Sequence, residues 1–127
     1  MPVKRLPGCF FGIRSSIFKD VDYFDEGTFL FFEEDTLASK LDKMGYKCGI
    51  VTSLKFKHCH VNSNKEAKHE IKMKKIYLQS KYYYFKKYGN LSKLKDIFLK
   101  LVLRYEFYES YVLAYVKKIV RKIKPNY

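Results

Sequence analysis

The chain has 127 residues, of which 26 are Lys or Arg and 13 are Asp or Glu, so its formal net charge is +13. A hydrophobic fraction of 47% and an aromatic fraction of 18% exclude a disordered chain and predict a folded core. The charge indicates an anionic partner, which can be nucleic acid, anionic lipid headgroups or a phosphate-bearing ligand. Three cysteines without C-x-x-C spacing, and the lack of an apolar stretch long enough for a signal peptide or a membrane span, predict a cytoplasmic chain without disulfides.

The first part of the chain predicts one strand and one short helix. Residues Cys9–Ile13 are apolar and bounded by glycine, which is typical of a buried strand. Ser15 or Ser16 can cap a short helix that follows. The segment Asp20–Asp22 has the D-x-D spacing of a metal motif, but it follows a helix rather than a buried strand. We therefore interpret it as part of a turn.

The most informative stretch begins with an aromatic run, Phe29–Phe32, and three consecutive acids, Glu33–Asp35. Apolar residues then recur at helical spacing and predict a helix over Thr36–Met44, which Gly45 ends by adopting a left-handed conformation. The acids thus lie at a helix N-terminus, where the helix dipole favours negative charge. A solvated first turn without chemistry is the simple interpretation. A carboxylate held rigidly beside a cleft is the functional one.

A second strand is predicted over Lys47–Ser53, and the segment that follows it, Leu54–His60, alternates in polarity. If this segment is extended, His58 and His60 lie on the same face and can ligate one metal ion together. A histidine pair of this kind is more often structural or solvent-exposed than metal-bound.

The second half of the chain predicts helices. Apolar residues keep helical spacing over Glu66–Tyr88 and again over Leu91–Lys124. The basic amphipathic segment Lys117–Lys124 suits an anionic membrane surface, or else packs its apolar stripe on the domain. Tyrosines alternate with lysines over Lys72–Lys87, a composition that also occurs in single-strand nucleic-acid binding. We consider nucleic acid an unlikely partner, because the chain has no RNA-recognition, helix-turn-helix or zinc-finger signature.

Several of these segments, in this order and spacing, resemble the C-terminal half of family 2 glycosyltransferases, the GT-A-fold enzymes of bacterial surface-polysaccharide assembly. The resemblance covers roughly the first half of the chain. It rests on the G-x-F-x-x-R pattern, the F-D-E turn, the aromatic segment ending in an E-E-D motif, the G-Y that closes the helix, and the H-x-H strand followed by Ser63. These elements are Gly8–Arg14, Phe24–Glu26, Phe29–Asp35, Gly45–Tyr46 and His58–His60.

The resemblance implies a base that takes the proton from an acceptor hydroxyl. An ungapped alignment gives this role to Glu34, and an alignment shifted by one residue gives it to Asp35; we favour Glu34. Glu33 and the other acid would then orient the base or hydrogen-bond the acceptor. Asp25 and Phe32 are the expected acceptor-binding residues.

The resemblance also implies a divalent cation, Mn²⁺ or Mg²⁺, held near the leaving diphosphate by His58 and, with less support, by His60. The implied partners are a nucleotide-sugar donor and a glycan or lipid-linked acceptor, at the inner face of the cell membrane. The nucleotide-binding half and its true D-x-D motif would precede Gly8 in that family. We therefore expect a glycosyltransferase fragment with little or no activity alone.

The expected fold class is α/β. A partial GT-A-like fold over residues 1–65, with a small mixed β-sheet and flanking helices, would form one compact unit with a basic helical region over residues 66–127. The exposed edge of such a sheet predicts a homodimer. A non-catalytic basic module for membrane surfaces or nucleic acid is the alternative to the enzyme.

Overall fold

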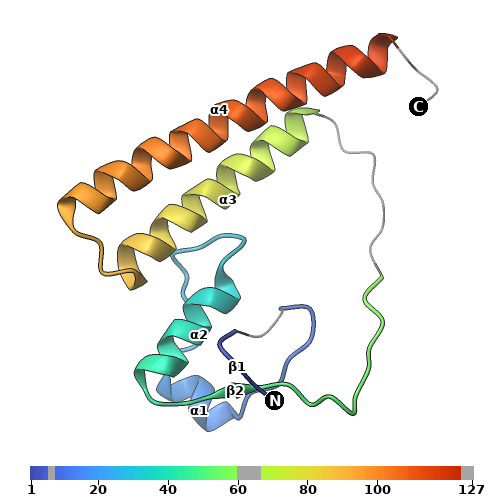
Figure 1. Cartoon of the computed structure of the whole chain (residues 1–127). Coiled ribbons are helices and arrows are strands. Elements are labelled where there is room, and N and C mark those ends of the chain that lie inside the picture. Colours follow the sequence, from blue (N-terminus) through green and yellow to red (C-terminus); the bar gives the residue numbers. More distant parts are fainter. Residues whose placement is uncertain (6–7, 60–66, 124–127) are drawn as a thin grey trace. The chain divides into compact units, whose positions relative to one another are not determined.

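The computed structural model describes residues 1–5, 8–59 and 67–123, and side chains up to residue 120. Its elements are, in chain order, β1 (Pro2–Val3), α1 (Ser15–Asp20), α2 (Glu33–Lys43), β2 (Cys48–Gly49), α3 (Ala67–Tyr88) and α4 (Lys93–Ile123), as shown in Figure 1. Contacts divide the chain into two compact units, Met1–Val61 and Asn62–Tyr127. They are called the first and the second unit below.

The predicted α/β fold is wrong, because the structure is 60% helical and only 4% strand and is not GT-A-like. Its sheet has two short antiparallel strands, β1 and β2, in which Pro2 lies opposite Gly49 and Val3 opposite Cys48. The N-terminal amine extends this pairing by donating to the Ile50 carbonyl at 2.9 Å. The mixed sheet whose edge was expected to join two copies is therefore not formed.

The predicted strands fail because a strand needs a neighbour that satisfies its backbone hydrogen bonds. Residues 9–13 are irregular, although Phe11 and Ile13 pack on the core while Phe10 is exposed. The alternating pattern there comes from a half-buried irregular segment. Of the strand expected over residues 47–53 only Cys48–Gly49 forms, and the alternating segment through Cys59 is irregular as well.

The core of the first unit lies between α1 and α2. Val21, Leu37 and Leu41 are buried together at its centre. The half-buried side chains that pack against them come from residues 11–18 and 46–48: Phe11, Ile13, Ile17, Phe18, Tyr46 and Cys48. The core thus holds the segment around Phe11 against one face of α2. The N-cap of α1 is Arg14 rather than a serine.

Helix α2 begins at Glu33, three residues before the predicted start, and ends where the sequence indicates. The amide of Gly45 donates to the Asp42 carbonyl at 3.0 Å, and the amide of Tyr46 donates to the Leu41 carbonyl at 2.9 Å. Together with a φ of +79° at Gly45, these two bonds make a Schellman motif. The prediction that Gly45 ends the helix is confirmed.

The second unit is an antiparallel pair of helices, α3 and α4, which lie side by side in Figure 1. Leu78 on α3 and Leu103 and Ala114 on α4 are buried. The predicted helix over Glu66–Tyr88 is confirmed as α3 from Ala67 onward, and Glu66 lies outside the described residues. The second helical region forms one long helix, α4. Within the described part of the chain, no helix is both long and apolar enough to cross a membrane.

Candidate active site at the start of helix α2

The three acids Glu33, Glu34 and Asp35 form the first turn of α2, as the sequence predicts. Their charges lie where unpaired backbone amides and the helix dipole favour anions. Phe32, the N-cap residue, has a left-handed backbone with φ of 67°, and Phe31 before it has φ of 71°. Two such residues in succession are strained, and strain of this kind concentrates at functional sites.

Asp35 is held by an arginine from the chain's N-terminal segment. The Arg5 Nη1 atom donates to Asp35 Oδ1 at 2.8 Å and to Oδ2 at 2.9 Å. A carboxylate occupied on both oxygens by a guanidinium is poorly placed to accept a proton from a substrate. Of the two candidate bases, this contact therefore disfavours Asp35 and leaves Glu34 as the preferred one.

The Glu34 carboxylate lies against the backbone of Gly8. A β-carbon at position 8 would overlap the end of the Glu34 side chain, so the carboxylate can occupy this position only when residue 8 is glycine. Gly8 belongs to the segment that Phe11 anchors on the core. Two motifs that are separated by about 25 residues of sequence, G-C-F-F-G and E-E-D, are therefore neighbours in the structure.

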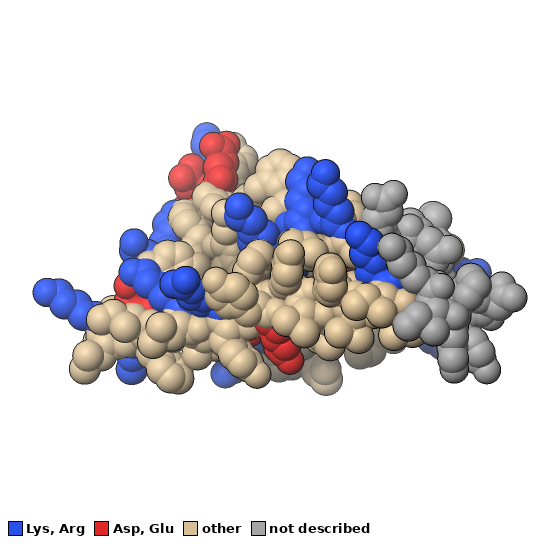
Figure 2. All heavy atoms as spheres, turned by 90° about the horizontal axis from the view of Figure 1, so that it is seen from above, with Lys and Arg blue, Asp and Glu red and all other residues tan. Residues whose placement is uncertain are grey.

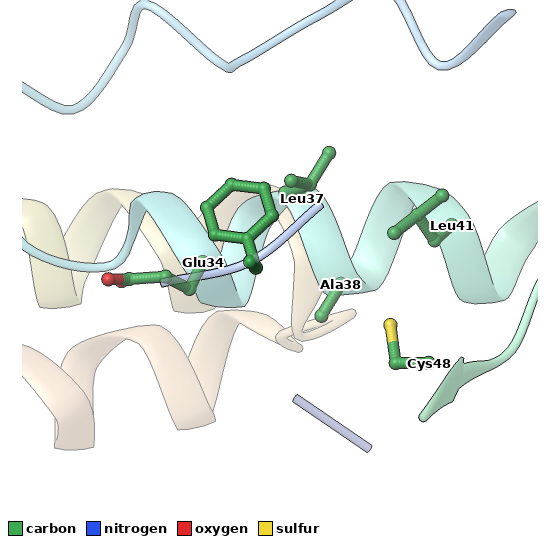
Figure 3. A pocket seen from close by; sticks show the side chains of 6 residues that line it. Glu34, Leu37, Ala38, Leu41 and Cys48 are labelled. Atoms are coloured by element: carbon green, nitrogen blue, oxygen red, sulfur yellow. The ribbon is translucent and has the colours of Figure 1, made fainter. Parts of the chain in front are cut away.

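Glu34 also stands at one end of a small apolar recess. The recess is lined by Phe11, Glu34, Leu37, Ala38, Leu41 and Cys48 and has a volume of about 20 Å³. In Figure 3 the Glu34 side chain points away from Leu37 and Leu41, with its carboxylate at the end of the row. Since this volume holds about one water molecule, a larger ligand would lie across the rim, in contact with the carboxylate and apolar side chains.

Asp25 and Phe32, the expected acceptor-binding residues, have structural contacts of their own. Asp25 is buried, and its Oδ1 accepts a hydrogen bond from the Gly27 amide at 3.0 Å, which fixes the turn before α2. Phe32 is half-buried at the N-cap. No contact described here joins either side chain to Glu34, so their roles toward an acceptor stay predictions.

Of the two predicted metal ligands, only His58 lies in the described part of the chain. His58 is exposed in an irregular segment, and His60 lies outside the described residues. No group of three or more His, Cys, Asp or Glu side chains within the described ranges is arranged to hold a metal ion. The described residues thus do not fit a complete site for Mn²⁺ or Mg²⁺, and no chemical step is assigned to a cation.

The tyrosines and lysines of α3 largely contact each other. Lysine ammonium groups lie 5.3 to 5.7 Å from the ring centroids in the pairs Lys74–Tyr77, Lys86–Tyr82, Lys87–Tyr83 and Lys87–Tyr88. Cation–π pairing of this kind accounts for the interleaved composition. It also occupies ring faces that a nucleic-acid base would need for stacking.

Sequence reasoning assigned no role to Arg5. No local sequence pattern links an arginine to an acid 30 positions away. The only sign of this contact in the sequence is that three adjacent acids need a counter-charge. Gly8 was interpreted as the boundary of a strand, and its contact with Glu34 was not predicted.

Comparisons of the chain with protein-family models, with curated proteins and with solved structures find no match.

Proposed function

We propose that this chain carries the acceptor side of a glycosyltransferase that uses a nucleotide-sugar donor, with Glu34 as the general base. The observation that supports this most strongly is the position of the Glu34 carboxylate beside Gly8, at the rim of an apolar recess lined by Phe11. A saccharide offers an apolar C–H face and several hydroxyl donors. An aromatic ring next to a carboxylate complements both.

In the proposed reaction, an acceptor hydroxyl donates a hydrogen bond to Glu34 and then transfers its proton to that carboxylate. The hydroxyl oxygen forms a bond to the anomeric carbon of the donor sugar, and the bond from that carbon to the nucleoside diphosphate breaks. The diphosphate leaves with the electron pair. The share of this chain in the reaction is to hold the acceptor and accept its proton, through positioning and general base catalysis.

The supporting contacts assign different roles to the three acids. Asp35 fixes the N-terminal segment through Arg5 and so helps to hold Gly8 near α2. The Glu33 carbonyl accepts a hydrogen bond at 2.9 Å from the hydroxyl of Thr36, which is completely buried and fixes the first turn. Glu34 is the acid at the recess.

The proposal is tested by titrating the ¹⁵N-labelled chain with methyl glycosides of glucose, galactose, rhamnose and N-acetylglucosamine while recording amide spectra. We expect at least one glycoside to shift the amides of Gly8, Phe11, Glu34 and Ala38 more than any others. The Asp42→Asn variant, which removes an exposed acid at the other end of α2, should respond in the same way. Shifts confined to other parts of the chain, or none with any glycoside, would contradict the proposal.

A further inference from the structure

The side of α4 that is turned away from α3 is apolar along almost its whole length. At 100° per residue, ten side chains share an arc of about 100° opposite the buried positions Leu103 and Ala114. They are called the outer face of α4 and comprise Leu94, Ile97, Phe98, Leu101, Tyr105, Tyr108, Val112, Tyr115, Val116 and Ile119. Each of them is between 45% and 80% exposed.

This outer face is larger than the apolar patches that most monomers expose. It extends over about 38 Å of helix at 1.5 Å per residue. Its four aromatic side chains, each with about 150–250 Å² of surface and more than half exposed, contribute about 500 Å² by themselves. Contiguous patches of this size indicate an interaction site.

Two of the three acids on α4 turn toward α3, and the third, Glu109, is exposed near one edge of the outer face. Asp96 and Glu106 turn toward α3, where Asp96 accepts a hydrogen bond from Tyr82 at 2.9 Å and Glu106 contacts Lys81 at 2.6 Å. Three basic residues instead lie within about 40° of arc along one edge of the outer face. They are called the basic flank and are Lys93, Arg104 and Lys118. Lys100 lies on the same arc but pairs with Asp96 at 2.7 Å. Figure 2 shows uncharged side chains in a broad band, with several Lys and Arg side chains along its upper margin and an acidic side chain at its lower margin.

We propose that the outer face of α4 docks on an anionic lipid bilayer, with the helix lying in the plane of the interface. Leucine, isoleucine, valine and phenylalanine would enter the boundary between headgroups and acyl chains. Tyrosine is suited to the same depth, since its ring is apolar and its hydroxyl reaches the wet side. The basic flank would contact anionic headgroups. This inference does not depend on the glycosyltransferase proposal.

The arrangement favours a bilayer over a second copy of the chain. The outer face has the alternating spacing of three and four residues that is typical of a coiled-coil seam, but Tyr105, Tyr108 and Tyr115 occupy positions where such a seam usually has aliphatic side chains. The edge opposite the basic flank carries one acid, Glu109, so a symmetric pair of helices would leave most of the basic flank without an acidic partner. Nucleic acid would engage the basic flank but leave the apolar residues unused.

The test is flotation of the full chain with vesicles of phosphatidylcholine alone or of phosphatidylcholine mixed with phosphatidylglycerol. We expect binding to the mixed vesicles only, weakened by salt. Leu101→Gln should reduce the partition coefficient by about tenfold, because a leucine buried in the interface is lost. Leu54→Gln, at an equally exposed leucine of the first unit, should leave the coefficient unchanged.

The basic flank is tested by the double variant Arg104→Gln/Lys118→Gln. Each basic residue lost should lower the partition coefficient about fivefold, so about 25-fold together. Lys72→Gln, at an exposed lysine on the side of α3 away from α4, should have little effect. Helical circular dichroism checks that every variant is folded.

Three results would overturn the inference: no binding of the folded chain to anionic vesicles, equal losses in the control variants, or a stable dimer that Leu101→Gln dissociates. The last result would show that a second copy covers the outer face.

Discussion

The Glu34 carboxylate and Gly8 lie in contact because position 8 has no side chain. The Arg5–Asp35 ion pair joins the N-terminal segment to the same helix turn. The sequence was sufficient to predict an acidic first turn of α2, since helical spacing and Gly45 define the helix locally. It could not show which acid is paired, because that depends on a residue 30 positions away.

Replacing Gly8 by Ala is expected to displace the Glu34 carboxylate while leaving the fold intact. The added β-carbon meets only the end of a flexible side chain, so Glu34 can adopt another rotamer at a cost of about 1 kcal/mol. Urea unfolding should therefore show a small loss of stability, and the glycoside-induced amide shifts should disappear. Gly12→Ala is the matched control, since a β-carbon there meets no atom within 4 Å. Unchanged shifts in Gly8→Ala would contradict the proposed site.

At the scale of elements, the helices were predicted well and the strands were not. A helix satisfies its own backbone hydrogen bonds, so its apolar period and its terminal glycine are enough to locate it. A strand depends on a partner, and the partner of Cys48–Gly49 is the segment Pro2–Val3, which has no strand pattern of its own. The α/β expectation failed because short apolar runs, one alternating segment and a family resemblance were taken as evidence for paired strands.

Gly45→Ala should destabilise the first unit by about 1 kcal/mol. Gly45 has a φ of +79°, which an alanine adopts only with strain. The measurement is the free energy of unfolding in urea, followed by circular dichroism. Gly49→Ala serves as the control, because the φ of Gly49 is not positive. A β-carbon added there would lie at ordinary contact distance from the nearest atom, the Met1 carbonyl oxygen. Equal losses in both variants would show that the left-handed position is not the cause.

The pairing of α3 and α4 should be sensitive to acid through Glu106. Hydrogen bonding to Lys81, supported by the charges of Lys81 and Lys74, lowers the pKa of Glu106 below its ordinary value of 4.5, although partial burial opposes this. Because the folded-state pKa is the lower one, this stabilisation is complete above the unfolded-state pKa. It is lost as the pH falls through the folded-state pKa.

Glu106→Gln should therefore lower the free energy of unfolding by about 1–2 kcal/mol at neutral pH, a range that allows for the partial exposure of the pair. The difference from the unmodified chain should shrink as the pH is lowered below that pKa. Urea unfolding at several pH values measures it, with Glu109→Gln, an exposed acid on α4, as the control. A difference that stays constant with pH would exclude the ionised Glu106 as its source.

At the scale of the whole molecule, the basic residues behind the net charge of +13 differ in their surroundings. Four lysines of α3 contact tyrosine rings or Glu106, whereas the basic flank of α4 borders an exposed apolar face. Composition indicated an anionic partner. It could not distinguish the lysines of α3 from the basic flank of α4, because that distinction depends on which side of α3 faces α4. For that reason we propose a lipid surface, rather than nucleic acid, as the anionic partner.

The most direct test of the central claim is calorimetric titration of the glycosides into the unmodified chain, Glu34→Gln and Asp42→Asn. If Glu34 accepts a hydrogen bond from the acceptor sugar, Glu34→Gln should weaken the affinity about tenfold or more, since hydrogen bonds to charged groups contribute about 1.5–3 kcal/mol. Asp42→Asn should bind as the unmodified chain does. Equal affinity of all three proteins, or no measurable binding by any of them, would contradict the assignment of Glu34 to an acceptor site.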